Sequence, residues 1–302
     1  MPPARPDGPS RGRPLLDEER SVPSRPSRRV RRNRAIVAGA AVLALVGGGA
    51  WWARDKVLTP WSETCSATAL GETVTFDPEQ MHNAAMMVQL GERRGLPARA
   101  GTIAIATAIQ ESKLRNITYG DRDSVGLFQQ RPSQGWGTVE EILDPHYATN
   151  AFYDALVKVD GWHDMVITEI AQEVQRSAFP EAYADHEHEG RAIASAVAGH
   201  SPGGMVCRLD APTKAGDPAR LVDDLRVETG TRGQTEGRDV VVRAGSSRRA
   251  WGIGAWAVAT AKDHGVVRVT VGDQQWDRSD GTQWQAAESP VDASTVVMTL
   301  AD

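Results

Sequence analysis

The feature that most constrains this 302-residue sequence is an apolar helical run that leads to a single carboxylate. Residues 103–109 are apolar nearly all round, which is typical of a buried helix rather than an amphipathic one. Glu111 stands at the end of this run. Loss of water at the end of a buried helix raises the pKa of a carboxyl group. The partial negative charge of a helix C-terminus acts in the same direction. We therefore expect Glu111 to hold its proton unusually well.

A polar loop follows this helix. It contains Asp121, Asp123 and the run Gly126-Leu127-Phe128-Gln129. A glycosidase needs one carboxyl group that is still protonated near neutral pH, because this group gives a proton to the leaving oxygen. Glu111 beside such a loop suits that role. A glutamate that only solvates a helix end is the alternative, and composition alone favours it.

The spacing of two short motifs resembles the signature of the lysozyme-like superfamily. Glu111-Ser112 is followed about fifteen residues later by Gly126-Leu127-Phe128-Gln129. The pair is most similar to soluble lytic transglycosylases and goose-type lysozymes, which carry Glu-Ser at the end of a core helix and then Gly-Leu-Met-Gln. Phe128 stands where Met is usual. The run from Gly120 to Trp136 is similar to a variant in wall-associated proteins of Gram-positive actinobacteria. The resemblance covers roughly residues 78–200.

The resemblance implies which residues act on a glycan. Glu111 is the expected general acid. In goose-type lysozymes an Asp shortly before the Gly-Leu-Met-Gln equivalent is implicated, so Asp123 is the expected second catalytic carboxylate, although Asp residues also cap turns. Tyr183 is the nearest candidate for the tyrosine of lytic transglycosylases whose hydroxyl contacts the acid. The residues expected to bind substrate are Ser112, Tyr119, Asp121, Gly126, Gln129, Gln130, Trp136 and Tyr183. Amide groups suit sugar hydroxyl and N-acetyl groups, whereas ordinary packing remains open for each aromatic residue.

The N-terminal region predicts export. Residues 35–52 form an uncharged stretch of eighteen residues, and a helix of that length spans about 27 Å, enough for a hydrocarbon core. Arginines precede this stretch and two tryptophans end it, which places its N-terminal side in the cytoplasm. We predict a disordered basic cytoplasmic tail at 1–34, a transmembrane signal-anchor at 35–52 and an exported linker at 53–76. A cleaved signal peptide is the alternative. Either reading puts the body outside the cytoplasm, and the anchor makes it a single-pass cell-membrane protein.

Charge and cysteine content narrow the classes of partner. Residues 1–34 hold ten Arg and four acidic residues, a net charge of +6, in a chain of net charge −5, so the remaining residues carry −11. An acidic body argues against a nucleic-acid partner. The two cysteines, Cys65 and Cys207, suggest one disulfide in an exported protein, with two unpaired thiols as the alternative. No His/Cys spacing typical of zinc occurs, so neither a metal nor a cofactor is expected.

The resemblance implies a mainly α lysozyme-like domain at 77–207. The sequence pattern predicts a linker at 208–246 and a small α/β domain at 247–302. Asp77, Pro78 and Gln80 form a capping-box start for the first helix. Thr138 and Glu141 form a second capping pair. The last region predicts one helix on a small antiparallel sheet, with strands at 266–271 and 295–300.

These observations together predict cleavage of peptidoglycan glycan strands at the outer face of the membrane. The enzyme is expected to be a lytic transglycosylase or a muramidase, with Glu111 as general acid. The alternative is a non-catalytic peptidoglycan-binding or scaffold protein of the cell envelope. Residues 247–302 are a candidate surface for envelope protein partners.

Overall fold

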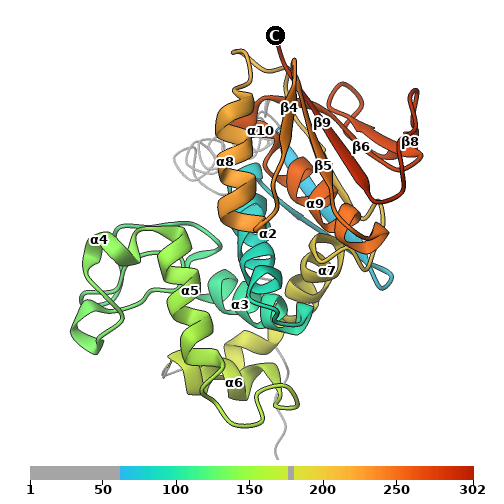
Figure 1. The fold of residues 1–302 in the computed structure, drawn as a ribbon. Coiled ribbons are helices and arrows are strands. Elements are labelled where there is room, and N and C mark those ends of the chain that lie inside the picture. The colour runs from blue at the N-terminus through green and yellow to red at the C-terminus, as the bar shows by residue number, and fades with distance from the viewer. Residues whose placement is uncertain (1–61, 176–179) are drawn as a thin grey trace, which may run out of the picture. The chain divides into compact units, whose positions relative to one another are not determined.

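The computed structural model describes residues 62–175 and 180–302, and the stretch Ser62–Asp302 forms one compact unit (Figure 1). The described part is mixed α and β, with nine α-helices and two antiparallel sheets. The predicted tail at 1–34, the predicted anchor at 35–52 and the first part of the predicted linker lie outside the described residues. Within the described residues, the search for a helix that could cross a membrane finds none.

The first sheet has three strands in the order β2-β1-β3: β1 (Thr64–Ala69), β2 (Glu72–Phe76) and β3 (Met205–Arg208). Leu70 and Gly71 join β1 to β2 with φ angles of 56° and 83°. Two positive φ angles suit a two-residue hairpin, because their twist matches that of the strands. Residues 64–76, which the sequence predicts as linker, are therefore a hairpin. The inward side chains of β1 are small, so its apolar alternation is weak in the sequence.

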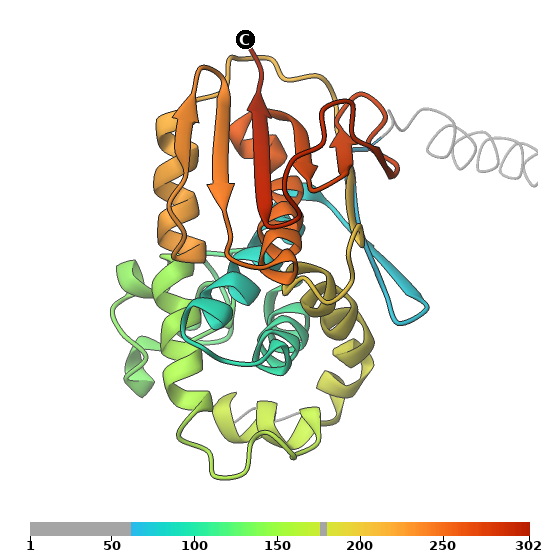
Figure 2. The same ribbon diagram turned by 45° about the vertical axis from the view of Figure 1, so that its right-hand side comes forward.

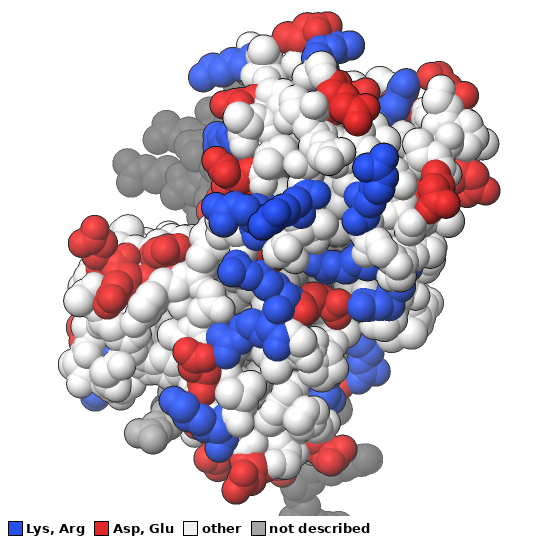
Figure 3. Space-filling view, viewed as in Figure 1, with Lys and Arg blue, Asp and Glu red and all other residues white. Residues whose placement is uncertain are grey.

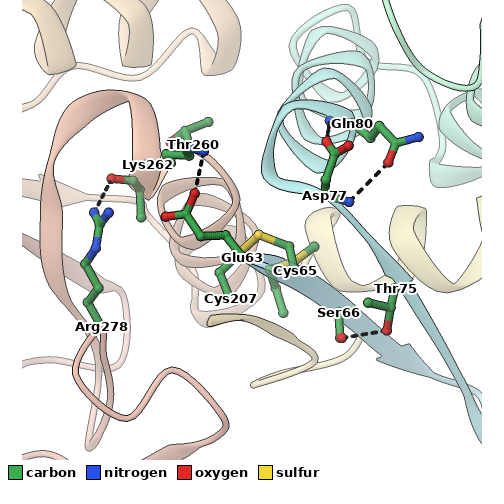
Figure 4. Close-up of a disulfide and its surroundings, with 12 residues drawn as sticks. Glu63, Cys65, Ser66, Thr75, Asp77, Gln80, Cys207, Thr260, Lys262 and Arg278 are labelled. Atoms are coloured by element: carbon green, nitrogen blue, oxygen red, sulfur yellow. Dashed lines mark hydrogen bonds and ion pairs between the residues drawn. A yellow bond between two sulfur atoms is a disulfide. The ribbon is translucent and has the colours of Figure 1, made fainter. Parts of the chain in front are cut away.

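A disulfide fastens this sheet, and the predicted pairing of Cys65 with Cys207 is confirmed (Figure 4). The two cysteines face each other in the β1–β3 register, and both are fully buried. They are separated by 142 positions in the sequence. The bond therefore joins the first strand of the described chain to the strand that follows the last helix of the helical region.

The helical region contains α2 (Pro78–Arg93), α3 (Ala98–Ser112), α4 (Val139–Ile142), α5 (Pro145–Leu156), α6 (Ile167–Gln175) and α7 (Glu187–Val197), with two short 3-10 helices, η1 (Pro132–Gln134) and η2 (Pro180–His186). The predicted capping boxes at Asp77 and Thr138 are confirmed. Helix α3 is buried along most of its length and contacts α2, α5, α6 and α7, and Figure 2 shows the teal helices enclosed by green and yellow ones. A Cβ at Gly190 of α7 would come within 2.6 Å of the Thr102 carbonyl oxygen, so a glycine is needed for this close approach to α3.

The second sheet has six strands in the order β4-β5-β9-β6-β7-β8. They are β4 (Gln234–Glu236), β5 (Asp239–Arg243), β6 (Val266–Val271), β7 (Gln274–Asp277), β8 (Trp284–Ala286) and β9 (Thr295–Leu300), accompanied by α8 (Pro218–Thr229), α9 (Ser247–Ala259) and α10 (Ala261–His264). The predicted strands at 266–271 and 295–300 and the helix packed on an antiparallel sheet are confirmed.

The stretch 208–246, which the sequence predicts as a linker, differs from that prediction. It contains helix α8 and strands β4 and β5, and β5 pairs with β9 near the centre of the sheet. Leu221 and Leu225 of α8 are fully buried, as are Val240 and Val242 of β5. Many polar residues surround these few apolar positions, which hides the pattern in the sequence. The stretch is an integral part of the second sheet and its covering helices.

Helix α2 connects the helical region with the six-stranded sheet, since it packs against both α8 and α9. Gln89 of α2 is fully buried, and its amide nitrogen donates to the carbonyl oxygens of Val197 at 2.7 Å and Gly252 at 3.1 Å. A buried amide satisfied by two separate helices fixes their relative position. The helical region and the sheet thus share a continuous core.

A buried carboxylate strengthens this junction. Glu228 of α8 is 3% exposed. It accepts a hydrogen bond from Trp256 Nε1 at 2.6 Å, and its Oε1 lies 3.1 Å from His146 Nε2 and 3.6 Å from His82 Nε2. The other ring nitrogen of His82 lies 2.7 Å from Asp263 Oδ2. His82 of α2 and His146 of α5 therefore share one counter-charge, the carboxylate of Glu228 on α8.

Replacing Glu228 with Gln is expected to lower the free energy of unfolding by roughly 3 kcal/mol, because two histidines lose their buried counter-charge. Burial alone would lower the pKa of His82, but the carboxylates of Asp263 and Glu228 outweigh it and raise this pKa to about 10. The native protein then keeps a proton that the unfolded chain releases above 6.5. This stabilisation is complete below pH 6.5 and is lost as the pH rises through about 10.

Urea unfolding of the two proteins at a series of pH values measures this effect. The decline in stability from neutral to alkaline pH should be smaller in Glu228→Gln than in the parent. Glu236→Gln, at an exposed position on β4, is the matched control and should change little. Equal stability of Glu228→Gln and the parent at pH 6 would contradict the assignment of Glu228 as a structural counter-charge.

Candidate active site

Glu111 lies in the last turn of α3, and its carboxyl group meets a tyrosine from a distant segment. The hydroxyl of Tyr183, in η2, donates a hydrogen bond of 2.5 Å to Glu111 Oε1. The two residues are 72 positions apart in the sequence. Tyr183 is fully buried, whereas Glu111 is partly exposed. The acid is thus held from inside the protein while part of it still reaches solvent.

The surroundings of Glu111 favour its protonated form. Burial raises the pKa of the carboxyl group, and the hydrogen bond from Tyr183 lowers it in part. The net shift is upward, in the direction that the sequence predicts. A raised pKa keeps the carboxyl group protonated to a higher pH than usual, which suits a proton donor to a bound ligand. Once it is ionised, the tyrosine hydroxyl remains as a donor to the carboxylate.

The backbone just after Glu111 has an unusual conformation. Lys113 and Leu114 have φ angles of 56° and 59°. Their N–H groups bond to the carbonyl oxygens of Ile109 at 3.0 Å and Ala108 at 3.1 Å, which closes the end of α3. Left-handed backbone is costly for a residue with a Cβ, and such strain gathers at functional sites.

Positive φ angles concentrate around this loop. Five described non-glycine residues have a positive φ, and all but Leu70 lie between positions 113 and 129. The other members of this group are Arg122, at 56°, and Gln129, at 48°. The loop beside Glu111 is therefore the most strained backbone in the described part of the chain.

The motif Gly126–Gln129 is anchored in the core directly beside the end of α3. Ser112 Oγ donates to the carbonyl oxygen of Leu127 at 2.7 Å. Leu127 and Phe128 are fully buried, and Phe128 stacks on Phe152 with ring centroids 4.6 Å apart. Gly126 has a φ of 80°, and a Cβ there would come within 2.7 Å of a backbone oxygen. Ser112 and Gly126 therefore both help to hold the loop in place.

Asp123 is committed to the loop itself. Its Oδ1 accepts from Arg131 Nε at 2.8 Å and from Ser133 Oγ at 3.0 Å, and its Oδ2 accepts from the Ser133 backbone N–H at 2.8 Å. The hydrogen bond from Arg131, together with those from Ser133, holds the pKa of Asp123 well below its usual range. Asp123 is therefore an ionised carboxylate whose two oxygens both have partners.

The remaining residues that are expected to contact sugar differ in their exposure to solvent. Tyr119 is 72% exposed, and Asp121 is also exposed. Gln129 is partly exposed, and its amide nitrogen donates to the Tyr119 carbonyl oxygen at 3.2 Å. Gln130, by contrast, is 1% exposed and donates to the Ala148 carbonyl oxygen at 3.2 Å. Gln130 therefore attaches the loop to α5, while the first three are accessible to a ligand.

Trp136 lines a cavity of about 670 Å³. Tyr147, whose hydroxyl donates to the Trp136 carbonyl oxygen at 3.2 Å, forms the adjacent wall. Polar side chains around the cavity include Gln134, Asp154, Lys158 and Glu173. Aromatic faces beside hydrogen-bonding groups suit a sugar. Glu111 is not among the residues that line this cavity.

Among the described residues, no group of three or more His, Cys, Asp or Glu side chains is placed to hold a metal ion. Sequence reasoning did not identify the partners of Asp123, because Arg131 and Ser133 reach it across a loop with no periodic pattern. The strain at Lys113 and Leu114 was also missed, since neither residue type signals a left-handed backbone.

Comparisons with known proteins add no assignment. A search of the sequence against protein-family models found no match. A search of curated proteins also found no match.

Proposed function

We propose that this protein cleaves the β-1,4 bond between N-acetylmuramic acid and N-acetylglucosamine in peptidoglycan, with Glu111 as the general acid. The observation that carries the proposal is the Glu111–Tyr183 pair, in which a desolvated carboxyl group with a raised pKa is oriented by a buried hydroxyl. The anchored Gly126–Gln129 turn lies beside this pair through the Ser112–Leu127 hydrogen bond. The combination suits a lysozyme-like domain.

The first step transfers the proton of Glu111 to the oxygen that leaves from the scissile bond. The bond breaks as positive charge develops on the muramic acid ring, and Glu111 becomes a carboxylate. Glu111 then accepts the proton of the 6-hydroxyl of the same sugar, and this oxygen attacks the anomeric carbon to form a 1,6-anhydro ring. Proton and electron pairs balance, and the acid is regenerated.

This lytic transglycosylase reaction is favoured over hydrolysis because of Asp123. A muramidase needs a second carboxylate to orient water or to stabilise the charged ring. Both oxygens of Asp123 are already occupied by Arg131 and Ser133. An internal nucleophile removes the need for that second carboxylate. Asp123 then acts by holding the loop in shape.

Incubation of the full-length protein with purified sacculi, followed by mass spectrometry, tests the proposal. Released muropeptides that carry the 1,6-anhydro ring are expected. Products heavier by one water would assign the muramidase reaction instead. Absence of any released sugar under conditions where the protein binds sacculi would overturn the enzymatic proposal.

Replacing Tyr183 with Phe is expected to shift the alkaline limb of the kcat/KM profile to higher pH and to lower kcat by about tenfold. Loss of the donor removes the contact that lowers the pKa of Glu111, so the proton is held more tightly. The carboxylate formed in the first step also loses a hydrogen bond. Tyr153→Phe is the matched control, because this hydroxyl donates to the Met87 carbonyl oxygen in the core at 2.8 Å. A pH profile that moves equally in both variants would contradict a specific role for Tyr183.

The predicted anchor and the disulfide support a location outside the cytoplasm for this activity. Disulfides persist in proteins outside the cytoplasm and are rare inside it. The bond between Cys65 and Cys207 therefore supports a body on the outer side of the membrane. Peptidoglycan is the polymer that a glycan-cleaving protein meets there.

One observation favours a second candidate function, a protein that binds peptidoglycan without cutting it. The cavity beside Trp136 and Tyr147 has features of a sugar site, but Glu111 does not line it. Binding to sacculi without released sugar would support this candidate. If Trp136→Ala then weakened binding, the cavity would be assigned as the glycan contact.

A further inference from the structure

Basic side chains gather in a band across the middle of one face of the protein (Figure 3). The band lies where the C-terminal ends of α2 and α8 meet the N-terminal end of α9. We call the six arginines at or beside these helix ends the arginine band: Arg93 in the last turn of α2, Arg226 in the last turn of α8, Arg232 just after α8, Arg243 at the end of β5, which leads into α9, and Arg248 and Arg249 in the first turn of α9. A positive surface of this size stands out in a body whose net charge is negative.

The fold brings three chain segments together to build the arginine band. Arg93, at the end of α2, donates to the carbonyl oxygen of Val227 on α8. Arg249, in the first turn of α9, donates to the carbonyl oxygen of Thr229 at 2.5 Å. These two arginines satisfy carbonyls at the end of α8, and they explain why the segments stay together.

Arg248 also caps a helix, because it donates to the carbonyl oxygen of Ala198, the C-cap of α7, at 2.6 Å. Arg248 pairs with Glu92 at 2.9 Å. Arg226, Arg232 and Arg243 are exposed, and none of them forms an ion pair with another residue of the described chain. Exposed like charges repel one another and are stabilised by an external anion. Their grouping is therefore better explained by a ligand than by folding.

The arginine band is remote from the candidate active site. Helices α2 and α3 form an antiparallel hairpin, because Gln80 and Asn83 at the start of α2 bond to the carbonyl oxygens of Lys113 and Leu114 after the end of α3. Arg93 is thus near the start of α3, while Glu111 is near its end. A helix of this length spans about 20 Å. The arginine band and Glu111 therefore lie at opposite ends of this helix pair.

We propose that the arginine band binds an anionic wall polymer that carries phosphodiester groups along its chain. Guanidinium groups bind phosphate oxygens in a forked geometry, and several exposed arginines without an ion-pair partner favour a ligand that carries several phosphate groups. The wall as the location of this partner rests on the proposed function. A second contact with the same wall would raise the effective concentration of Glu111 at its glycan.

The test compares binding of the full-length protein to two preparations of Gram-positive sacculi in a sedimentation assay. One preparation is untreated, and the other has been stripped of phosphodiester-linked polymers with hydrofluoric acid. The triple variant Arg226→Glu, Arg232→Glu, Arg243→Glu is expected to bind untreated sacculi about tenfold more weakly than the parent. On stripped sacculi the two proteins should bind alike. The parent's advantage on untreated sacculi should also shrink as salt is raised.

A matched control changes the net charge equally elsewhere, at Lys214, Arg220 and Arg238, which are exposed and lie outside the arginine band. This control should bind like the parent, and the arginines of residues 1–34 are the same in every variant. Equal loss of binding in both triple variants would overturn the proposal, because it would reflect net charge alone. So would an undiminished effect on stripped sacculi, or tighter binding to anionic lipid vesicles or to duplex DNA than to the wall.

Cleavage of stripped sacculi is measured in parallel. The arginine-band variant should release sugar from this substrate at the rate of the parent, since Glu111 is untouched. If the variant binds untreated sacculi like the parent while cleavage is intact, only the proposed role of the arginine band is wrong. If the parent protein does not cleave the sacculi, the proposed function is wrong, but the binding result remains valid.

Discussion

Replacement of Glu111 with Gln is expected to reduce glycan-strand cleavage by about 10³-fold or more. The amide has nearly the same shape as the carboxyl group and can still accept the hydrogen bond from Tyr183. The amide has no acidic proton to give to the leaving oxygen. It also cannot accept the proton of the 6-hydroxyl in the second step. The loss should appear in kcat, with binding to sacculi almost unchanged.

Zymography and muropeptide release from sacculi measure this loss. Glu140→Gln is the matched control, because this exposed glutamate lies in the first turn of α4 and makes no contact in the candidate site. Cleavage by Glu111→Gln at more than a tenth of the parent rate would show that another group supplies the proton. The proposed mechanism would then be wrong even if the domain binds peptidoglycan.

A stability measurement on the same variant separates catalysis from folding. The pKa of Glu111 is raised in the native protein, so the native state binds more protons than the unfolded chain once the pH exceeds the ordinary value for a glutamate. Ionisation in a partly desolvated position therefore costs stability as the pH rises through this window. Glu111→Gln should be as stable as the parent at acid pH and more stable at alkaline pH. Such a gain in stability on substitution is typical of a residue that is selected for activity and not for stability.

The sequence predicted best those features that local chemistry determines. Capping by Asp77 and Thr138 depends on residues within one helical turn, and both capping boxes are present. The buried character of α3 follows from an apolar run that only Thr107 interrupts.

Features that depend on distant partners were harder to predict. Strand β5 is recognisable only beside β9, with which it pairs although more than fifty residues separate them. The buried charge of Glu228 becomes favourable only because His82 and His146 come from other helices. The contact between Tyr183 and Glu111 has no periodicity in the sequence and was suggested by resemblance alone. Such pairs arise from tertiary packing, which overrides local preference.

Removal of the disulfide by Cys65→Ala with Cys207→Ala is expected to lower the free energy of unfolding by about 5 kcal/mol. The bond closes a loop of 142 positions, and a loop of this length removes much of the conformational freedom of the unfolded chain. Alanine is preferred to serine in this test, because both sulfurs are fully buried and a hydroxyl would need a partner there.

Urea unfolding followed by tryptophan fluorescence measures the change, and reduction of the parent protein with a thiol should reproduce it. The slope of the free energy against urea should rise in the variant, since the unfolded chain without the cross-link exposes more surface. A change below about 1 kcal/mol would mean that the strands β1 and β3 stay together in the unfolded ensemble. The Glu111–Tyr183 pair lies outside the three-stranded sheet. Cleavage below the unfolding midpoint should therefore persist in the variant, and its loss there would show that the sheet also positions α7 and η2, both of which pack on α3.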